Sequence, residues 1–267
     1  MRSTTYFPQQ HSRSPCTITI RSMLCELTMV LGVVFAYSLT RGLARAKSAN
    51  ATRNAEIIMR TEQALHLDVE RMMQAFGLTH LVLVHAANIC YVVGHLPVLI
   101  GVGIWLYGWR PPHYLPLRNA FLLTAIGGLM LYVRFPVASP RFFSGFTDTL
   151  QRDGFSYDES PVGLFYNPYA AMPSLQVGWA LLAGIAVVRG ARGRALKIVG
   201  AIYPVLMMLA VVITANHYVL DIAAGVALSC ISLGLTLPRS PRHHLWQIGY
   251  HRGVTGQAQS PGDARHE

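Results

Sequence analysis

The residues of this chain best suited to chemistry are a histidine and an aspartate four positions apart in an apolar segment. His217 and Asp221 lie in the sequence NHYVLD. Positions four apart share one face of a helix, so Asp221 can bind one ring nitrogen of His217 and leave the other free. That is the arrangement of an oriented base or nucleophile. The alternatives are a His–Asp pair without a function, or two ligands of a metal ion. Because ionisable side chains are costly in apolar surroundings, we favour a functional site.

A second motif, MPSLQ, opens another apolar run. Pro173 suits the first turn of a helix, where its missing N–H costs nothing. The backbone N–H groups of Ser174 and its successors are then free to bind an anion, and the Ser174 hydroxyl adds a further donor. Gln176 is not explained as part of a capping box, which would place it at position 177.

Two arginines end an earlier apolar run. Arg134 and Arg141 are separated by six residues in RFPVASPRF. Two guanidinium groups near a membrane surface are able to clamp a phosphate bidentately. The alternative is that both side chains reach from the apolar region to the membrane surface without a ligand.

Taken in order, Arg-x6-Arg, Pro-Ser-x-Gln and His-x3-Asp resemble the signature of the type 2 phosphatidic acid phosphatase (PAP2) superfamily, over about residues 80 to 237. The sequences of the three motifs, FPVASPR, NPYAAMPSL and ANHYVLDIAAG, are more similar to the branch of inositol phosphorylceramide synthases and their bacterial homologues. The resemblance implies a helical membrane enzyme that acts on lipid phosphates and needs no metal or other cofactor.

The resemblance also implies roles for individual residues. His217 matches the nucleophile that becomes phosphohistidine, and Asp221 matches the residue that orients it. Arg141 and Arg134 would bind phosphate oxygens, although Arg134 stands where many members have Lys. Ser174 matches the phosphate-binding serine of the second motif.

Three positions depart from the family pattern. Phe142 replaces a proline, Val211 replaces an arginine of many phosphatases, and Gln176 replaces the histidine that protonates the leaving oxygen. An amide has no titratable proton near neutral pH, but Gln176 can still donate a hydrogen bond to a phosphate or leaving oxygen. Three interpretations remain open: a substrate with a stable leaving group, binding without turnover, or a proton from another group, with Tyr166, Tyr169 or Tyr218 as candidates.

Composition predicts the surroundings of this site. The chain has 267 residues, of which 52% are hydrophobic and 13% charged, which is too apolar for an ordinary soluble domain. The net charge of +10 comes from arginines in short loops, as in membrane proteins, so we expect no nucleic-acid partner. The four cysteines show no paired spacing, which argues against disulfides and a zinc site.

We therefore predict an all-α membrane protein with about six spans. The expected apolar runs are Leu24 to Leu39, Leu81 to Trp109 with a kink at Pro97, Ala120 to about Ala138, Val177 to Val188, Ile198 to Thr214 and Tyr218 to Leu237. The first run is interpreted as an uncleaved span rather than a signal peptide cleaved near Ala44-Arg-Ala46. Residues 41 to 79 are expected to form an amphipathic helix at the interface.

The predicted domains are an N-terminal region (1–79), a catalytic membrane domain (80–237) and a polar, disordered tail (238–267). Arginines between the fourth and fifth spans predict a cytoplasmic end there, which puts the polar loop Ser139 to Ala171 outside. The predicted function is a lipid phosphatase or phosphotransferase with a lipid phosphate substrate. The alternatives are a degenerate member that binds lipid phosphate and a small transporter; the oligomeric state is not predicted.

Overall fold

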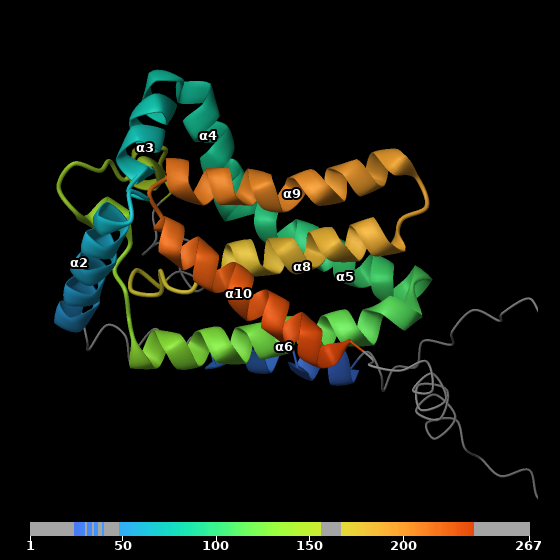
Figure 1. Cartoon of the computed structure of the whole chain (residues 1–267). Coiled ribbons are helices and arrows are strands. Elements are labelled where there is room, and N and C mark those ends of the chain that lie inside the picture. The colour runs from blue at the N-terminus through green and yellow to red at the C-terminus, as the bar shows by residue number, and fades with distance from the viewer. Residues whose placement is uncertain are drawn as a thin grey trace, which may run out of the picture.

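The computed structural model describes residues 48–155 and 167–237, together with 24–29, 31–33, 35, 36 and 39. Helices dominate this part of the chain, which confirms the all-α prediction (Figure 1). The main helices are α2 (Ser48–Ala64), α3 (Glu70–Thr79), α4 (Leu81–Ile89), α5 (His95–Trp109), α6 (Pro111–Arg134), α8 (Leu175–Gly190), α9 (Arg194–Ile213) and α10 (Val219–Thr236). Shorter elements are the π-helical turn η1 (Cys90–Gly94), the 3-10 turn η2 (Pro140–Phe142) and α7 (Thr149–Arg152).

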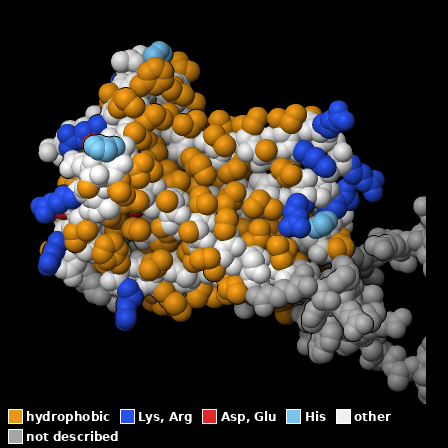
Figure 2. Space-filling model, viewed as in Figure 1, with side chains coloured by type: hydrophobic (Ala, Val, Ile, Leu, Met, Phe, Trp, Pro, Cys, Tyr) orange, Lys and Arg blue, Asp and Glu red, His pale blue; other side chains and the backbone are white. Residues whose placement is uncertain are grey.

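Four helical segments are long and apolar enough to cross a membrane: Leu81–Trp109, Pro111–Arg134, Arg194–Ile213 and Val219–Thr236. The two other expected spans correspond to shorter apolar helices, Leu24–Val33 and Leu175–Gly190. Figure 2 shows a broad hydrophobic surface across the middle of the molecule, with Lys and Arg side chains towards its two ends. The chain is therefore a multi-pass membrane protein.

Helix α8 lies at the centre of the bundle, in contact with α5, α6, α9 and α10. Glycines let these helices approach closely. A Cβ on Gly184 would strike the carbonyl oxygen of Gly200 in α9, and one on Gly178 would strike the Ser229 hydroxyl in α10. Helix α8, with 16 residues, is therefore packed closely between its neighbours.

Several boundaries differ from the sequence prediction. Helix α6 begins at Pro111, nine residues earlier than expected, because prolines are favoured in a first helical turn. It ends at Arg134 rather than near Ala138, since Phe135 precedes Pro136 and is biased towards extended conformations. The π-helical turn η1 ends at Gly94, three residues before Pro97, which lacks the N–H that would bind the carbonyl of Val93 in this turn.

The expected interfacial segment is two helices rather than one. Helix α2 buries Ala51, Ala55 and Ile58 on one face, and α3 follows after a short turn. The two predicted regions on either side of residue 79 are in contact. For example, Asn54 Nδ2 donates a hydrogen bond to the Pro136 carbonyl over 2.8 Å. The division into regions 1–79 and 80–237 stays a prediction.

Some predictions concern residues that the structure does not describe. These are the polar lead 1–22, the possible cleavage site Ala44-Arg-Ala46, Tyr166 and the tail 238–267.

Candidate phosphoryl-transfer site

Three connecting segments meet at one end of the helical bundle. The segment after α6 pairs with the segment before α8, where Val137 N–H donates to Tyr169 O over 2.9 Å and Ala171 N–H donates to Val137 O over 3.1 Å. The Arg141 N–H donates to Ala215 O over 3.0 Å, in the turn between α9 and α10. These backbone bonds bring the three sequence motifs together.

The turn that carries His217 is tightly held. The N–H groups of Asn216 and His217 both donate to the Val211 carbonyl, at 2.9 and 3.2 Å. Ala215 adopts the left-handed conformation, with φ of 51°. After a helix, this conformation is usually adopted by glycine. Val211, where many family members have arginine, is fully buried in the apolar core and cannot contact a ligand in this structure.

The His217 ring is buried and has partners on both nitrogens. Its Nδ1 lies 2.7 Å from Ala171 O and 3.4 Å from Asp221 Oδ2. Both are acceptors, so Nδ1 carries a hydrogen, and Nε2 of a neutral ring keeps its lone pair. The sequence predicted the Asp221 contact but not the shorter bond to the backbone.

Gln176 is the group that faces His217 Nε2, with its Oε1 at 3.2 Å. Its Nε2 donates to the Tyr91 hydroxyl over 3.2 Å. This orientation suits a protonated His217 Nε2. With a neutral ring, the amide rotated by half a turn donates to His217 and accepts the Tyr91 O–H instead, because a phenol both donates and accepts. Gln176 thus adapts to either protonation state of His217.

Ser174 is the N-cap of α8, where its Oγ accepts the Val177 N–H over 3.4 Å. Pro173 precedes this cap and does not lie in the first helical turn as predicted. The Ser174 N–H, predicted to be free, donates to Asp221 O over 2.9 Å. In the described part of the chain, the N–H groups of Leu175 and Gln176 have no acceptor. The anion-binding donors of this terminus are therefore one residue further along than predicted.

The two arginines differ sharply in their surroundings. The Arg141 side chain is fully buried, and its Nε lies 3.7 Å from Asp148 Oδ2. Arg134 is exposed at the end of α6 and makes no hydrogen bond or ion pair with any described residue. The structure therefore brings together His217, Asp221, Ser174 and Gln176 directly, links Arg141 to them through Ala215, and leaves Arg134 at the edge.

The family model described as the PAP2 superfamily matches residues 56–235 of this chain, which is two thirds of its length. The chain belongs to the PAP2 superfamily. No match was found among curated proteins or among solved structures. Membership indicates membrane phosphatase or phosphotransferase activity on substrates of the lipid phosphate type, without identifying the substrate or a branch.

Two buried glutamates beside the PAP2 motifs were missed by sequence reasoning. Glu70 Oε1 accepts the Val219 N–H over 2.8 Å, and Glu62 Oε1 accepts the Leu220 N–H over 2.7 Å. Asp221 Oδ2 accepts the Tyr218 N–H over 2.9 Å, so three carboxyl groups cap the start of α10. Burial, reinforced by the charges of Glu70 and Asp221, raises the pKa of Glu62 to about 8.

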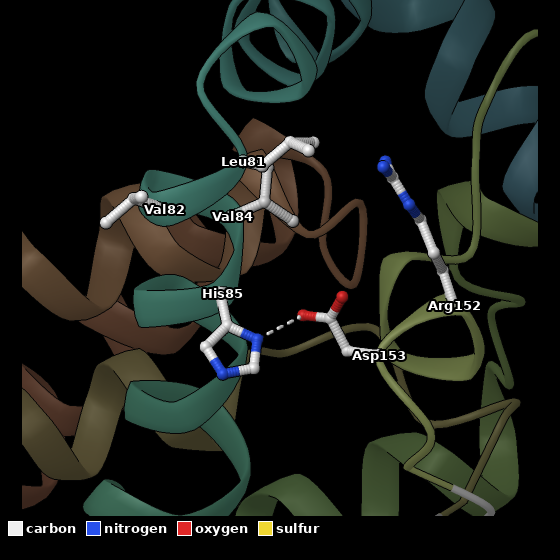
Figure 3. Close-up of a pocket in the computed structure, with 6 residues that line it drawn as sticks. All are labelled: Leu81, Val82, Val84, His85, Arg152 and Asp153. Carbon is white, nitrogen blue, oxygen red and sulfur yellow. Dashed lines mark hydrogen bonds and ion pairs between the residues drawn. The ribbon is translucent and has the colours of Figure 1, made fainter.

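A surface cavity of about 320 Å³ lies between α4 and α7, outside the PAP2 motifs (Figure 3). His85 and Asp153 point towards each other across it, with 3.1 Å between Nδ1 and Oδ2. Behind them, the buried Asn88 binds the Thr149 carbonyl and hydroxyl and the Asp153 carboxylate. This clamp fixes α7 and therefore the preceding Asp148, the ion-pair partner of Arg141.

Within the described ranges, no group of three or more His, Cys, Asp or Glu side chains is arranged to hold a metal ion. The candidate donors of the site are instead the Arg141 guanidinium, the Ser174 hydroxyl and the N–H groups at the start of α8.

Proposed function

We propose that this PAP2 protein is a lipid phosphatase or phosphotransferase that works through a phosphohistidine at His217. The observation that carries the proposal is the buried ring of His217, whose Nδ1 is fixed by Ala171 O and Asp221 while its Nε2 faces the start of α8. A fixed Nδ1–H directs the nucleophilic lone pair to Nε2.

The reaction has two balanced steps. First, the Nε2 lone pair of His217 attacks phosphorus, the bond to the leaving oxygen breaks, and that oxygen takes up a proton. Second, the oxygen of water or an alcohol attacks the phosphohistidine, loses its proton and releases His217. The negative charge of the transferred group is stabilised by Arg141, the Ser174 hydroxyl and the N–H groups of Leu175 and Gln176, with Arg134 as an outer contact.

Substrate enters this scheme on the Gln176 side. Only Gln176 contacts Nε2 among the described residues, and its side chain is partly exposed, whereas the Nδ1 side is closed by Ala171 and Asp221. A phosphate that reaches Nε2 therefore displaces the Gln176 carboxamide, which then remains close enough to bind a phosphate or leaving oxygen.

The amino-acid sequences of the three motifs support transfer of the phosphoryl group to an alcohol acceptor, as in the inositol phosphorylceramide synthase branch. The acceptor would be an alcohol such as inositol or a lipid hydroxyl, with water as a competitor. The buried Val211 in place of a phosphatase arginine supports the same choice, because it leaves one cation fewer to hold the phosphate.

The site is proposed to face the extracytoplasmic side. The turns at the opposite end of the bundle, between α5 and α6 and between α8 and α9, carry Arg110, Arg189, Arg192, Arg194 and Lys197. Positively charged short loops favour the cytoplasm. Because α8 runs from the site to this end, the site lies on the other side of the membrane.

The test is phosphate release and transfer from lipid monophosphates, lipid diphosphates and phosphoinositol lipids by purified protein in detergent, with and without an alcohol acceptor. We expect turnover that His217→Ala abolishes and that His80→Ala, an exposed histidine between α3 and α4, leaves unchanged. Equal rates for wild type and His217→Ala on every substrate would refute the proposal.

A second candidate is a lipid phosphate-binding protein without turnover, favoured by one observation: Gln176 occupies the place of the leaving-group acid. It predicts that a lipid phosphate binds wild type and His217→Ala equally, with no product. The transporter alternative receives little support, because His217 lies in the turn between α9 and α10 rather than within a candidate span.

A further inference from the structure

The proposed reaction leaves one proton without a source, because Gln176 cannot protonate an alkoxide leaving group. We propose that Tyr91 donates this proton, an inference that rests on the proposed function. Tyr91 lies in the π-helical turn η1, far from the three motifs in sequence, and its hydroxyl binds Gln176 over 3.2 Å. It thus stands directly behind the residue that replaces the acid.

Other tyrosines are placed less favourably. The Tyr218 hydroxyl is buried on the far side of the turn, in a small cavity with Glu62 and Glu70. Its oxygen has no hydrogen-bond partner among the described residues and therefore makes no hydrogen bond to Gln176. Tyr169 packs against the apolar cluster around Ala55 and Val137. Tyr91 is the described tyrosine whose hydroxyl is hydrogen-bonded to Gln176.

The direction of the hydrogen bond favours donation by Tyr91. When the Tyr91 oxygen accepts the Gln176 N–H, its own hydrogen points elsewhere, and no described residue accepts it. A substrate oxygen that displaces the Gln176 carboxamide from Nε2 therefore meets an available O–H. Arg141 and Asp148 are the charged side chains that act on this hydroxyl. The Arg141 cation favours the phenolate that donation creates, whereas the Asp148 carboxylate opposes it.

The proton balance closes over the two steps. As the phosphorus–oxygen bond breaks, the Tyr91 O–H protonates the leaving alkoxide and becomes a phenolate. When water or an alcohol then attacks the phosphohistidine, the phenolate takes the proton from the attacking oxygen. Tyr91 and His217 both return to their starting states, as microscopic reversibility requires.

Comparison of two leaving groups separates proton donation from mere positioning. In Tyr91→Phe, turnover of an alkyl phosphate should fall roughly 100- to 10,000-fold, because its alkoxide needs a general acid. Turnover of p-nitrophenyl phosphate, whose leaving group is a stable anion, should fall less than about 10-fold. Preserved turnover of the aryl substrate also shows that the variant folds. Tyr203→Phe, which removes a partly buried hydroxyl bonded to His95, is the matched control and should affect both substrates alike.

Rescue provides the second measurement. Adding Gln176→His to Tyr91→Phe restores an acid at the usual family position and should recover alkyl phosphate turnover. An equal loss on both substrates in Tyr91→Phe, or no loss on either, would overturn the role of Tyr91 and leave the phosphohistidine intact. If neither substrate shows turnover that depends on His217, the proposed function fails, and this inference fails with it.

Discussion

Gly225 offers a sharp test of how the site is held together, because it lies one turn after Asp221 where α10 crosses the start of α8. A Cβ at this position would overlap the Ser174 carbonyl oxygen and lie 3.0 Å from the carbonyl carbon and 3.3 Å from the nitrogen of Ser174. All three are backbone atoms, so no side-chain rotation relieves the clash. The change Gly225→Ala must push the start of α8 away from α10.

The expected cost follows from this geometry. Overpacking costs about 1–3 kcal/mol. Loss of the bond between Ser174 N–H and Asp221 O adds about 1–2 kcal/mol if the buried N–H stays unpaired. Together these are about 2–5 kcal/mol, which corresponds to a fall in Tm of roughly 5–15 °C. A shift of Ser174 and Gln176 on the order of 1 Å relative to His217 should lower turnover about 100-fold.

The assay is thermal unfolding in detergent, followed by tryptophan fluorescence, together with the phosphate assay. Gly101→Ala is the matched control, because a Cβ on this α5 glycine meets nothing within 4 Å. It should leave Tm unchanged or slightly raise it, since alanine favours helices. Indistinguishable Tm values and rates for the two variants would show that Ser174 is not held by contact with α10.

Three further predictions concern the surroundings of the site. Because the pKa of Glu62 is raised from 4.5 to about 8, its stabilising contribution is complete below about pH 4.5 and is lost as the pH rises through 8, so Tm should fall over this range. Glu62→Gln should flatten that fall in a Tm–pH series; an unchanged slope would contradict the assignment. Ala215→Gly should raise stability by about 1 kcal/mol in denaturant titrations by relieving the left-handed backbone, and a loss would count against this strain. Asn88→Ala should weaken substrate binding more than maximal rate, measured as KM against kcat, by loosening α7; equal effects on both would argue otherwise.

Local signals were enough to predict the helical membrane fold and the positions of the motifs. The long apolar runs required spans, and the four-residue spacing of His217 and Asp221 put both side chains at one helix start. The substitution at Gln176 was visible because the flanking residues fixed its alignment with the family histidine. The structure then placed its carboxamide beside His217 Nε2.

The missed residues come from segments distant in sequence. Tyr91 reaches Gln176 from 85 positions away, and Glu62 reaches Leu220 from 158. Periodicity alone gives no account of such partners, because it describes one helix and not its neighbour. One signal was available: Glu62 and Glu70 fall among apolar residues in an amphipathic segment, and buried carboxylates need hydrogen-bond donors. The first turn of α10 supplied them.

The distribution of charge around His217 explains why phosphate is expected at one helix start and not at the other. Both α8 and α10 begin at the site, and each terminus favours an anion. At α10 the N–H groups of Tyr218, Val219 and Leu220 are already taken by protein carboxyl groups. A phosphate there would lose those donors and meet negative charge. At α8 the N–H groups of the first two helical residues remain available, next to Nε2 of His217. The glutamates therefore direct an incoming anion to the side of the ring where Gln176 and Tyr91 lie.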